Sequence, residues 1–92
     1  MRTILIYPGH RVRLSELAKG ASAVVREVED APAADPIARR LRELGFVSGE
    51  PVRVVATGPV GGDPLLVQIG YTRFALRRAE AARVVLMVGE AA

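Results

Sequence analysis

The chain has 92 residues, which is enough for one domain with a modest hydrophobic core. It has no cysteine and one histidine, His10, which excludes a disulfide framework, a thiolate zinc site and a multi-histidine metal centre within one chain. The formal net charge is +3, and twelve of the thirteen basic residues are arginine. The hydrophobic half is chiefly valine, alanine and leucine with only four aromatic residues, a composition that favours short strands with small side chains.

Residues 1–11 are expected to form an N-terminal segment separate from the core of the domain. Residues Ile4 to Tyr7 predict an arm or a short extra strand, which the Pro8-Gly9 turn signal ends. Such an apolar arm could add to a sheet edge, so we expect weak self-association through it. The longest apolar runs fall far below the ~20 residues that span a bilayer, and no secretory signal is present. We therefore expect a cytoplasmic protein without direct membrane insertion.

Two strands are expected next. Alternation over residues 11–14 predicts the first, and Ser15 is expected to cap one helical turn that ends at Gly20. The β-branched segment from Ala21 to Val28 predicts the second strand, and residues 29–34 predict a polar loop.

The clearest local signal predicts a short amphipathic helix over residues 36–44. An aspartate can serve as its N-cap, and the proline that follows occupies the first helical position, where no N–H is needed. Apolar residues then recur at i, i+4 and i+7, and a glycine suits the left-handed position after the helix, with a phenylalanine packing back. These residues are Asp35, Pro36, Ile37, Leu41, Leu44, Gly45 and Phe46.

The second half of the chain predicts strands joined by turns. Residues 51–57 and 65–69 are expected to pair across a loop from Gly58 to Pro64. Gly70 and Tyr71 turn the chain into a strand over 72–76, and one helical turn over 77–82 precedes a closing strand over 83–88. About five core strands and one helix, inserted after the second core strand, predict a mainly β fold in the form of a small closed or nearly closed barrel.

No catalytic constellation is visible. The only histidine lies in the N-terminal arm, and the serines lack the setting of a nucleophile elbow. The carboxylates at positions 27, 29 and 30 are better explained as a solvated loop than as a metal site. We therefore expect no enzyme, no metal site and no cofactor.

Arginines are the best candidates for contact with a partner. Three lie on the predicted helix and three near the second helical turn, and they would form a cationic surface if the fold brought them together. These are Arg39, Arg40, Arg42, Arg73, Arg77 and Arg78. An RNA-binding small barrel is the alternative function, but RNA readers usually add exposed aromatic side chains, and interleaved acidic residues also argue against nucleic acid.

Three segments in register resemble the FeoA family. The first is RRLRELGFVSGEPVRVV at residues 39–55, the second is GPVGGDP at 58–64, and the third is GYTRFALRRAEA at 70–81. The resemblance covers roughly Val12 to Val88. Two features depart from the family pattern: Ser48 stands where proline is common, and the pair Gly61-Gly62 suggests a one-residue insertion.

The resemblance implies an SH3-like domain over 12–89, between the arm and a short tail at 90–92. It further implies an accessory or regulatory protein of bacterial ferrous iron uptake, which contacts FeoB, a membrane permease with a GTPase domain. Such a protein would be cytoplasmic and peripheral at the inner membrane through its partner. The structural motif residues, beyond those of the helix, would be Gly58, Pro59, Gly62, Asp63, Pro64, Gly70, Ala75 and Leu76.

Overall fold

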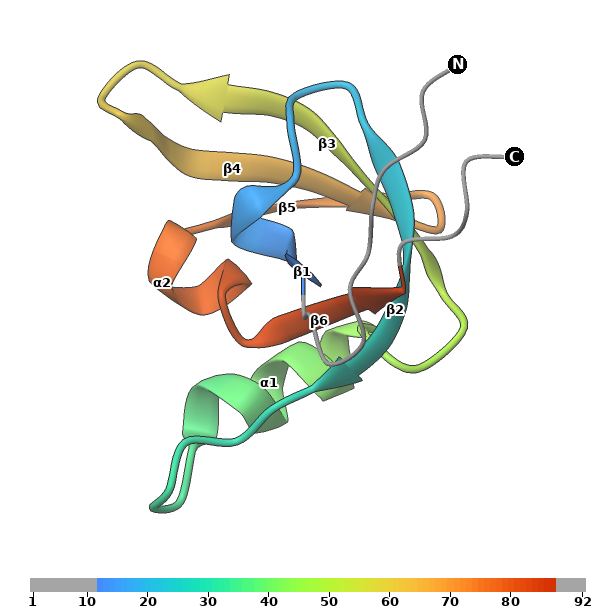
Figure 1. The fold of residues 1–92 in the computed structure, drawn as a ribbon, viewed down its shortest axis with the longest axis vertical. Helices are drawn as coiled ribbons and strands as arrows, with labels where there is room; N and C mark the ends of the chain where they lie inside the picture. Colours follow the sequence, from blue (N-terminus) through green and yellow to red (C-terminus); the bar gives the residue numbers. More distant parts are fainter. Residues whose placement is uncertain (1–11, 88–92) are drawn as a thin grey trace.

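The structure, a computed structural model, describes residues 12–87. The arm at 1–11, with the self-association expected of it, and the tail at 90–92 lie outside the described residues. Figure 1 shows strands that curve around a core, with α1 lying against β2 and β6. In chain order the elements are β1 (Val12–Arg13), the 3-10 helix η1 (Leu14–Glu16), β2 (Ser22–Val28), α1 (Pro36–Leu44), β3 (Pro51–Gly58), β4 (Gly62–Ile69), β5 (Thr72–Leu76), α2 (Arg78–Ala81) and β6 (Val84–Met87).

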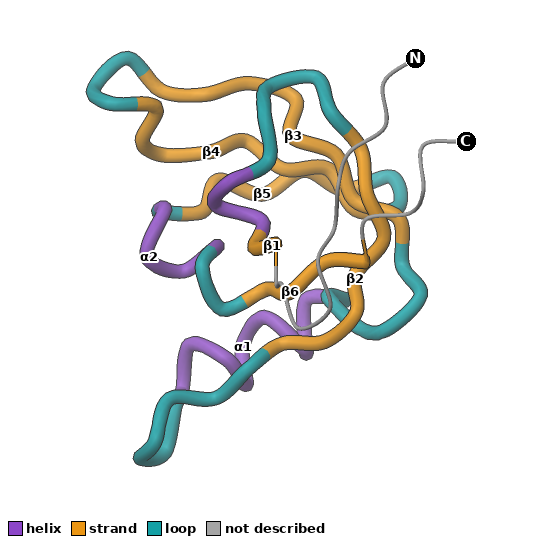
Figure 2. Tube along the Cα trace, in the orientation of Figure 1, coloured by secondary structure: helices purple, strands orange, loops and turns teal. Residues whose placement is uncertain are grey.

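The described strands form one antiparallel sheet in the order β1-β6-β2-β3-β4-β5 (Figure 2). The predicted mainly β fold, with its helix after the second strand, is confirmed. The sheet has six strands rather than about five, and the first of them, β1, pairs with β6 as an edge strand. Among the described strands, β1 and β5 lie at the two ends of the sheet and do not pair with each other, so the sheet is open rather than a closed hydrogen-bonded barrel. The two short helices η1 and α2 contact each other, and they also contact β6 and β4 respectively, so they link the two ends of the sheet.

The core lies inside this curved sheet and is built of small aliphatic side chains around one aromatic ring. Phe46 is fully buried, and its ring lies 6.1 Å from that of half-buried Phe74. Alternation on β3 buries Val52 and Val54, and a register shift between Val54 and Ala56 then interrupts the pattern. The buried aliphatic residues are Leu14, Val25, Val28, Ala38, Leu41, Val52, Val54, Leu65, Val67, Ile69, Leu76, Ala81, Val84, Val85 and Leu86.

Two local predictions were wrong. The first helical turn begins at Leu14, one residue before the expected cap, because Leu14 is fully buried and turns the chain into the core. Its N-cap is Arg13, whose backbone N–H donates a 2.7 Å hydrogen bond to Glu16 Oε1, so Ser15 is not the cap.

The hairpin loop is also shorter than predicted. Strand β3 continues to Gly58 and β4 begins at Gly62, with these two residues paired across the ladder. A Cβ on Gly58 would lie 2.2 Å from the carbonyl oxygen of Asp63, so only glycine permits this close approach. Gly58 and Gly62, which were predicted to lie in the loop, therefore belong to the strands.

No helix within residues 12–87 is long and apolar enough to cross a membrane.

Candidate functional site

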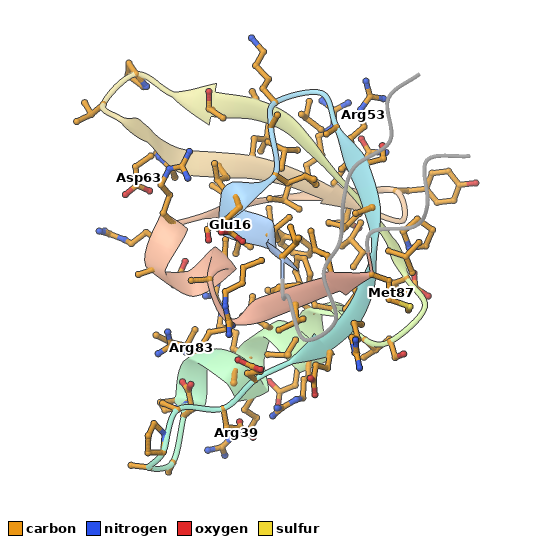
Figure 3. The ribbon with its side chains drawn as sticks, in the orientation of Figure 1. Glu16, Arg39, Arg53, Asp63, Arg83 and Met87 are labelled. Atoms are coloured by element: carbon orange, nitrogen blue, oxygen red, sulfur yellow. The ribbon has the colours of Figure 1, made fainter. Side chains whose placement is uncertain are left out.

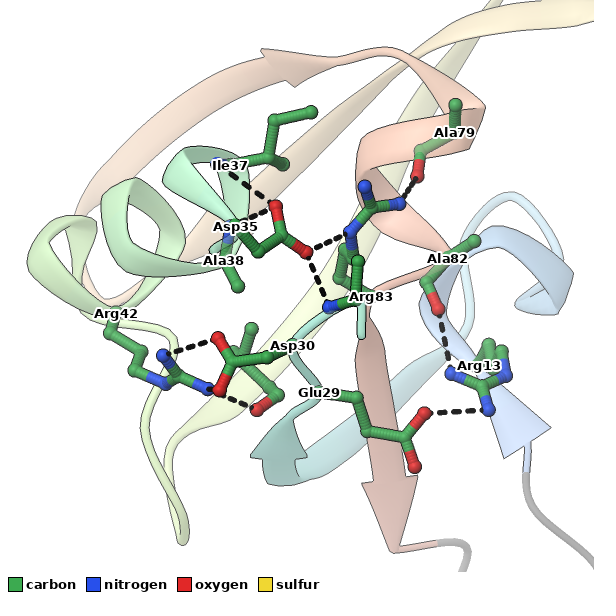
Figure 4. A network of polar contacts seen from close by, with 12 residues as sticks. Arg13, Glu29, Asp30, Asp35, Ile37, Ala38, Arg42, Ala79, Ala82 and Arg83 are labelled. Carbon is green, nitrogen blue, oxygen red and sulfur yellow. Dashed lines mark hydrogen bonds and ion pairs between the residues drawn. The ribbon is translucent and has the colours of Figure 1, made fainter. Parts of the chain in front are cut away.

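Asp35 fixes the start of α1. Its Oδ1 accepts hydrogen bonds from the backbone N–H groups of Ile37 and Ala38, both at 3.2 Å, which satisfies donors that the first helical turn leaves unpaired. Its Oδ2 accepts from the N–H of Ala31 at 2.8 Å and from Arg83 Nε at 2.6 Å. Because Arg83 lies between α2 and β6, one carboxylate ties α1 to the C-terminal part of the fold (Figure 4).

The environment of Asp35 keeps it ionised. Its side chain is only 2% exposed, but the hydrogen bonds from Arg83 and from the N–H of Ala31 outweigh the cost of burial. Together they lower the pKa of Asp35 from its ordinary 3.8 to about 2. The carboxylate is therefore fully engaged in holding the fold at neutral pH.

Arg42 holds the loop before α1 against that helix. Its Nη1 and Nη2 donate to Asp30 Oδ1 and Oδ2 at 3.0 and 3.1 Å, and Nη2 also donates to the carbonyl oxygen of Val28 at 2.7 Å. The hydrogen bonds to Asp30 raise the pKa of Arg42 above its ordinary value. This fork engages both terminal nitrogens of the guanidinium within the chain (Figure 4).

Arg78 clamps the tip of the β3–β4 hairpin. Its Nη1 donates to the carbonyl oxygen of Ser15 in η1, and its Nε donates to that of Gly61 at 3.2 Å. Its backbone N–H donates to Asp63 Oδ1 at 3.0 Å. A Cβ on Gly62 would lie 2.7 Å from Arg78 Nη2, so a glycine at this position leaves room for the guanidinium. The clamp fixes the hairpin relative to η1 and α2.

A hollow of about 580 Å³ lies between α1, the hairpin tip and α2. Figure 3 shows Asp63 between the hairpin and α2, at the edge of this region. The described side chains that line it are two arginines, two carboxylates and three apolar residues, and none of them is aromatic. They are Arg40, Val60, Asp63, Pro64, Ala75, Arg77 and Glu80.

The charged side chains of the hollow differ in how many hydrogen bonds they make within the described chain. Asp63 Oδ1 accepts from the N–H of Arg78, and Glu80 Oε1 accepts from the N–H of Arg77 at 2.9 Å, so both carboxylates serve the first turn of α2. Arg40 Nη1 lies 3.8 Å from Glu80 Oε2, too far for a hydrogen bond, and the Arg40 side chain is 58% exposed. The Arg77 guanidinium makes no hydrogen bond or ion pair with residues 12–87. The hollow therefore presents two cationic groups with unused donors.

The structure separates the six arginines that the sequence offered for partner contact. Arg40 and Arg77 meet at the hollow, and Arg42 and Arg78 are engaged in the fold beside it. Arg39 is exposed on the side of α1 away from α2, as Figure 3 shows. Arg73 lies on β5, where its Nε donates to Gln68 Oε1 at 3.1 Å.

Sequence reasoning missed two members of the hollow. Val60 is 79% exposed at the hairpin tip, and a single valine among glycines and prolines gave no signal. Glu80 follows Arg77 by three residues, the spacing of a capping box, and that spacing could have identified it. No group of three or more histidine, cysteine, aspartate or glutamate side chains that could hold a metal ion occurs in residues 12–87.

A family model, a curated relative and solved structures indicate the same family. The chain matches the FeoA domain over residues 12–88. Over 73 residues it is 37% identical to a fusion of Fe(2+) transport protein A with the Fe(2+) transporter FeoB from Porphyromonas gingivalis. The match takes in 79% of this chain but only 8% of the length of that relative.

Solved structures of FeoA proteins share the fold. FeoA from Stenotrophomonas maltophilia, a prokaryotic SH3 domain protein crystallised with zinc, is 67% identical, with 83% of this chain and 89% of that one aligned at a TM-score of 0.77. FeoA from Chlorobium tepidum is 35% identical, with 84% and 70% aligned at a TM-score of 0.71. By the match over residues 12–88 and these similarities, the chain belongs to the FeoA family.

Proposed function

We propose that this chain is a cytoplasmic, non-catalytic accessory protein of bacterial ferrous iron uptake that acts by contact with an FeoB-type permease. One observation supports this most directly: in the Porphyromonas gingivalis relative, the homologous domain and an FeoB transporter form a single polypeptide. Fusion raises the effective concentration of two modules that work together. Where the two are separate chains, a binding surface is needed to bring them together.

The proposed contact surface is the hollow with the arginines at its rim. Arg40 and Arg77 have unused donors, and Val60, Pro64 and Ala75 supply apolar contact beside them. Arginine next to apolar surface is typical of residues that dominate binding energy at protein interfaces. Arg42 and Arg78 contribute indirectly, because they hold α1 and the hairpin at the two sides of the hollow.

A binding measurement tests the function. The full chain is immobilised, and the FeoB protein of the same organism is added in lipid nanodiscs and, separately, as its soluble GTPase domain. We expect saturable binding at micromolar concentrations to at least one of the two. Absence of binding to both at tens of micromolar would contradict the proposal.

RNA binding is the second candidate, and one observation favours it. Arg53, Gln68 and Arg73 lie opposite one another across β3, β4 and β5, and Tyr71 beside them is 104% exposed. Proteins that bind single-stranded nucleic acid combine cationic side chains, which contact the phosphates, with exposed aromatic rings, on which the bases stack. Phosphate-driven binding weakens steeply with salt, so an oligouridine that binds equally at 50 and 200 mM salt would argue against this candidate.

A further inference from the structure

The hollow lacks the lining that a proline-rich peptide needs. Proline-rich segments dock in grooves of SH3 domains that are lined by aromatic side chains. None of the described residues lining this hollow is aromatic. The fully exposed Tyr71 follows the opposite end of β4, about 20–25 Å along the strand from the hairpin tip. The lining therefore points to another class of segment.

The polar groups of the hollow define what that segment must carry. Arg40 projects from α1 and Arg77 precedes α2, so two guanidinium groups reach the space from different elements. Guanidinium groups bind carboxylates and phosphates through paired and charge-assisted hydrogen bonds. The carboxylates already present, Asp63 and Glu80, each accept a hydrogen bond from a backbone N–H at the start of α2. Glu80 also forms a loose ion pair with Arg40 at 3.8 Å, whereas the Arg77 guanidinium has no ion pair within residues 12–87.

Nucleic acid fits the hollow less well than a polypeptide does. A phosphate backbone would bring continuous negative charge past Asp63 and Glu80 and would offer few donors to their remaining oxygen lone pairs. A polypeptide offers both carboxylate acceptors and backbone N–H donors. The mixed rim is therefore complementary to an acidic polypeptide segment.

The hollow is also formed before any partner arrives. Arg78 fixes the hairpin tip through Gly61 and Ser15, and Asp35 fixes α1 relative to Arg83, so both walls are held by contacts within the chain. At the tip, Val60 remains 79% exposed and offers an apolar contact beside the charged groups. A site held in this way loses little conformational entropy on binding.

We infer that this hollow binds an acidic, carboxylate-bearing segment of the partner protein, with Arg40 and Arg77 as the two anchoring cations. The inference rests on the proposed contact with the permease and specifies its chemistry. A proline-rich segment is excluded as the occupant by the lining.

A titration with three peptides tests it directly. The 15N-labelled full chain is titrated with twelve-residue peptides that repeat Glu-Ala-Glu-Val, Lys-Ala-Lys-Val or Pro-Ala-Ala-Pro. We expect only the acidic peptide to shift the amide signals of Arg40, Val60, Asp63, Arg77 and Glu80, and we expect 0.5 M salt to reverse the shifts. Absence of these shifts at millimolar acidic peptide, or equal shifts with the proline-rich peptide, would overturn the inference.

Matched variants distinguish binding at this hollow from a general effect of net charge. Replacing both anchors (R40Q with R77Q) is expected to weaken binding of the acidic peptide at least tenfold. The control pair R53Q with R73Q removes the same charge from the sheet face and should leave binding unchanged. Thermal unfolding of both variants verifies that the fold is intact, and equal binding by the two pairs would contradict the assignment.

The same variants distinguish this inference from the proposed function. If FeoB binds the wild-type chain and the R40Q/R77Q variant equally, the contact with FeoB stands and the acidic site is wrong. If FeoB does not bind at all while the acidic peptide binds the hollow, the site stands and its assignment to the permease is wrong.

Discussion

At the scale of single residues, Asp35 joins three parts of the chain with one carboxylate. It caps α1, holds the loop through the N–H of Ala31, and pairs with Arg83 at 2.6 Å. Local sequence predicted the first of these contacts, because an aspartate before a proline is a helix-start signal. The pairing with Arg83, 48 residues away, has no local signal and depends on how the sheet returns the last strand to α1.

The pKa of Asp35 gives a pH-dependent prediction. Folding lowers this pKa from 3.8 to about 2, so the ionised form is favoured by the folded state. The stability it supplies is fully present above about pH 4 and is lost as the pH falls from 3.8 toward 2. We expect D35N to lower the midpoint of thermal unfolding by on the order of 10 °C at pH 7. We also expect the gap between the variant and the wild type to close between pH 4 and pH 2.

Circular dichroism melts at pH 7, 4, 3 and 2 measure this gap. Asp30 provides the control, because it also pairs with an arginine but is exposed, so D30N should shift the midpoint by about 2 °C or less. A gap between D35N and the wild type that stays constant from pH 7 to pH 2 would show that the Asp35 charge does not stabilise the fold.

At the scale of elements, the sequence predicted α1 far better than the β3–β4 hairpin. Every signal for α1 is local, from the cap at Asp35 to Gly45, whose φ of +114° ends the helix. The hairpin depends on long-range geometry. Gly58 is a strand residue because it pairs with Gly62 and closely approaches Asp63 on the facing strand, which no local pattern shows. Alternation did predict a strand over residues 11–14, and β1 is the part of it at Val12 and Arg13.

The contacts of the arginines, like the hairpin, could not be predicted from local sequence. The sequence placed Arg39, Arg40 and Arg42 on the predicted helix, but it could not show that Arg42 would meet Asp30. It also could not show that Arg40 would reach the same hollow as Arg77, because that hollow is assembled from α1, the hairpin and α2. Sequence reasoning thus named candidate residues but could not assemble the site.

Removing the Arg78 clamp should loosen the hairpin tip without unfolding the domain. R78A loses the hydrogen bonds to the carbonyl oxygens of Ser15 and Gly61. We expect the amide of Asp63, which donates to the carbonyl oxygen of Val60 at 3.1 Å, to exchange with solvent at least tenfold faster. Amide exchange followed by NMR measures this change.

The neighbouring arginine is the control for the clamp. Arg77 has no side-chain hydrogen bond within residues 12–87, so R77A should leave the exchange rate of the Asp63 amide unchanged. If R78A and R77A gave the same rate, the hairpin would be held by its strand pairing rather than by Arg78.

At the scale of the whole molecule, one small aliphatic core must support a sheet that is open at both edges. Phe46 is the largest side chain fully buried in it, and it enters the core directly after α1 ends. Its N–H donates to the carbonyl oxygen of Leu41 at 3.1 Å, so the same residue closes the helix and fills the core. Helix and sheet are therefore coupled through one ring, so loss of the ring should destabilise both together.

Two aromatic residues of similar size allow a matched test of that coupling. Phe46 is 0% exposed and Tyr71 is 104% exposed. We expect F46A to destabilise the fold by about 3–5 kcal/mol, because the ring leaves a cavity that a domain this small cannot fill. Since small domains are stable by about 5–15 kcal/mol, this loss removes a large part of the total. Y71A should change stability by less than about 0.5 kcal/mol. Urea unfolding followed by circular dichroism measures both, and equal losses would contradict the proposed organisation of the core.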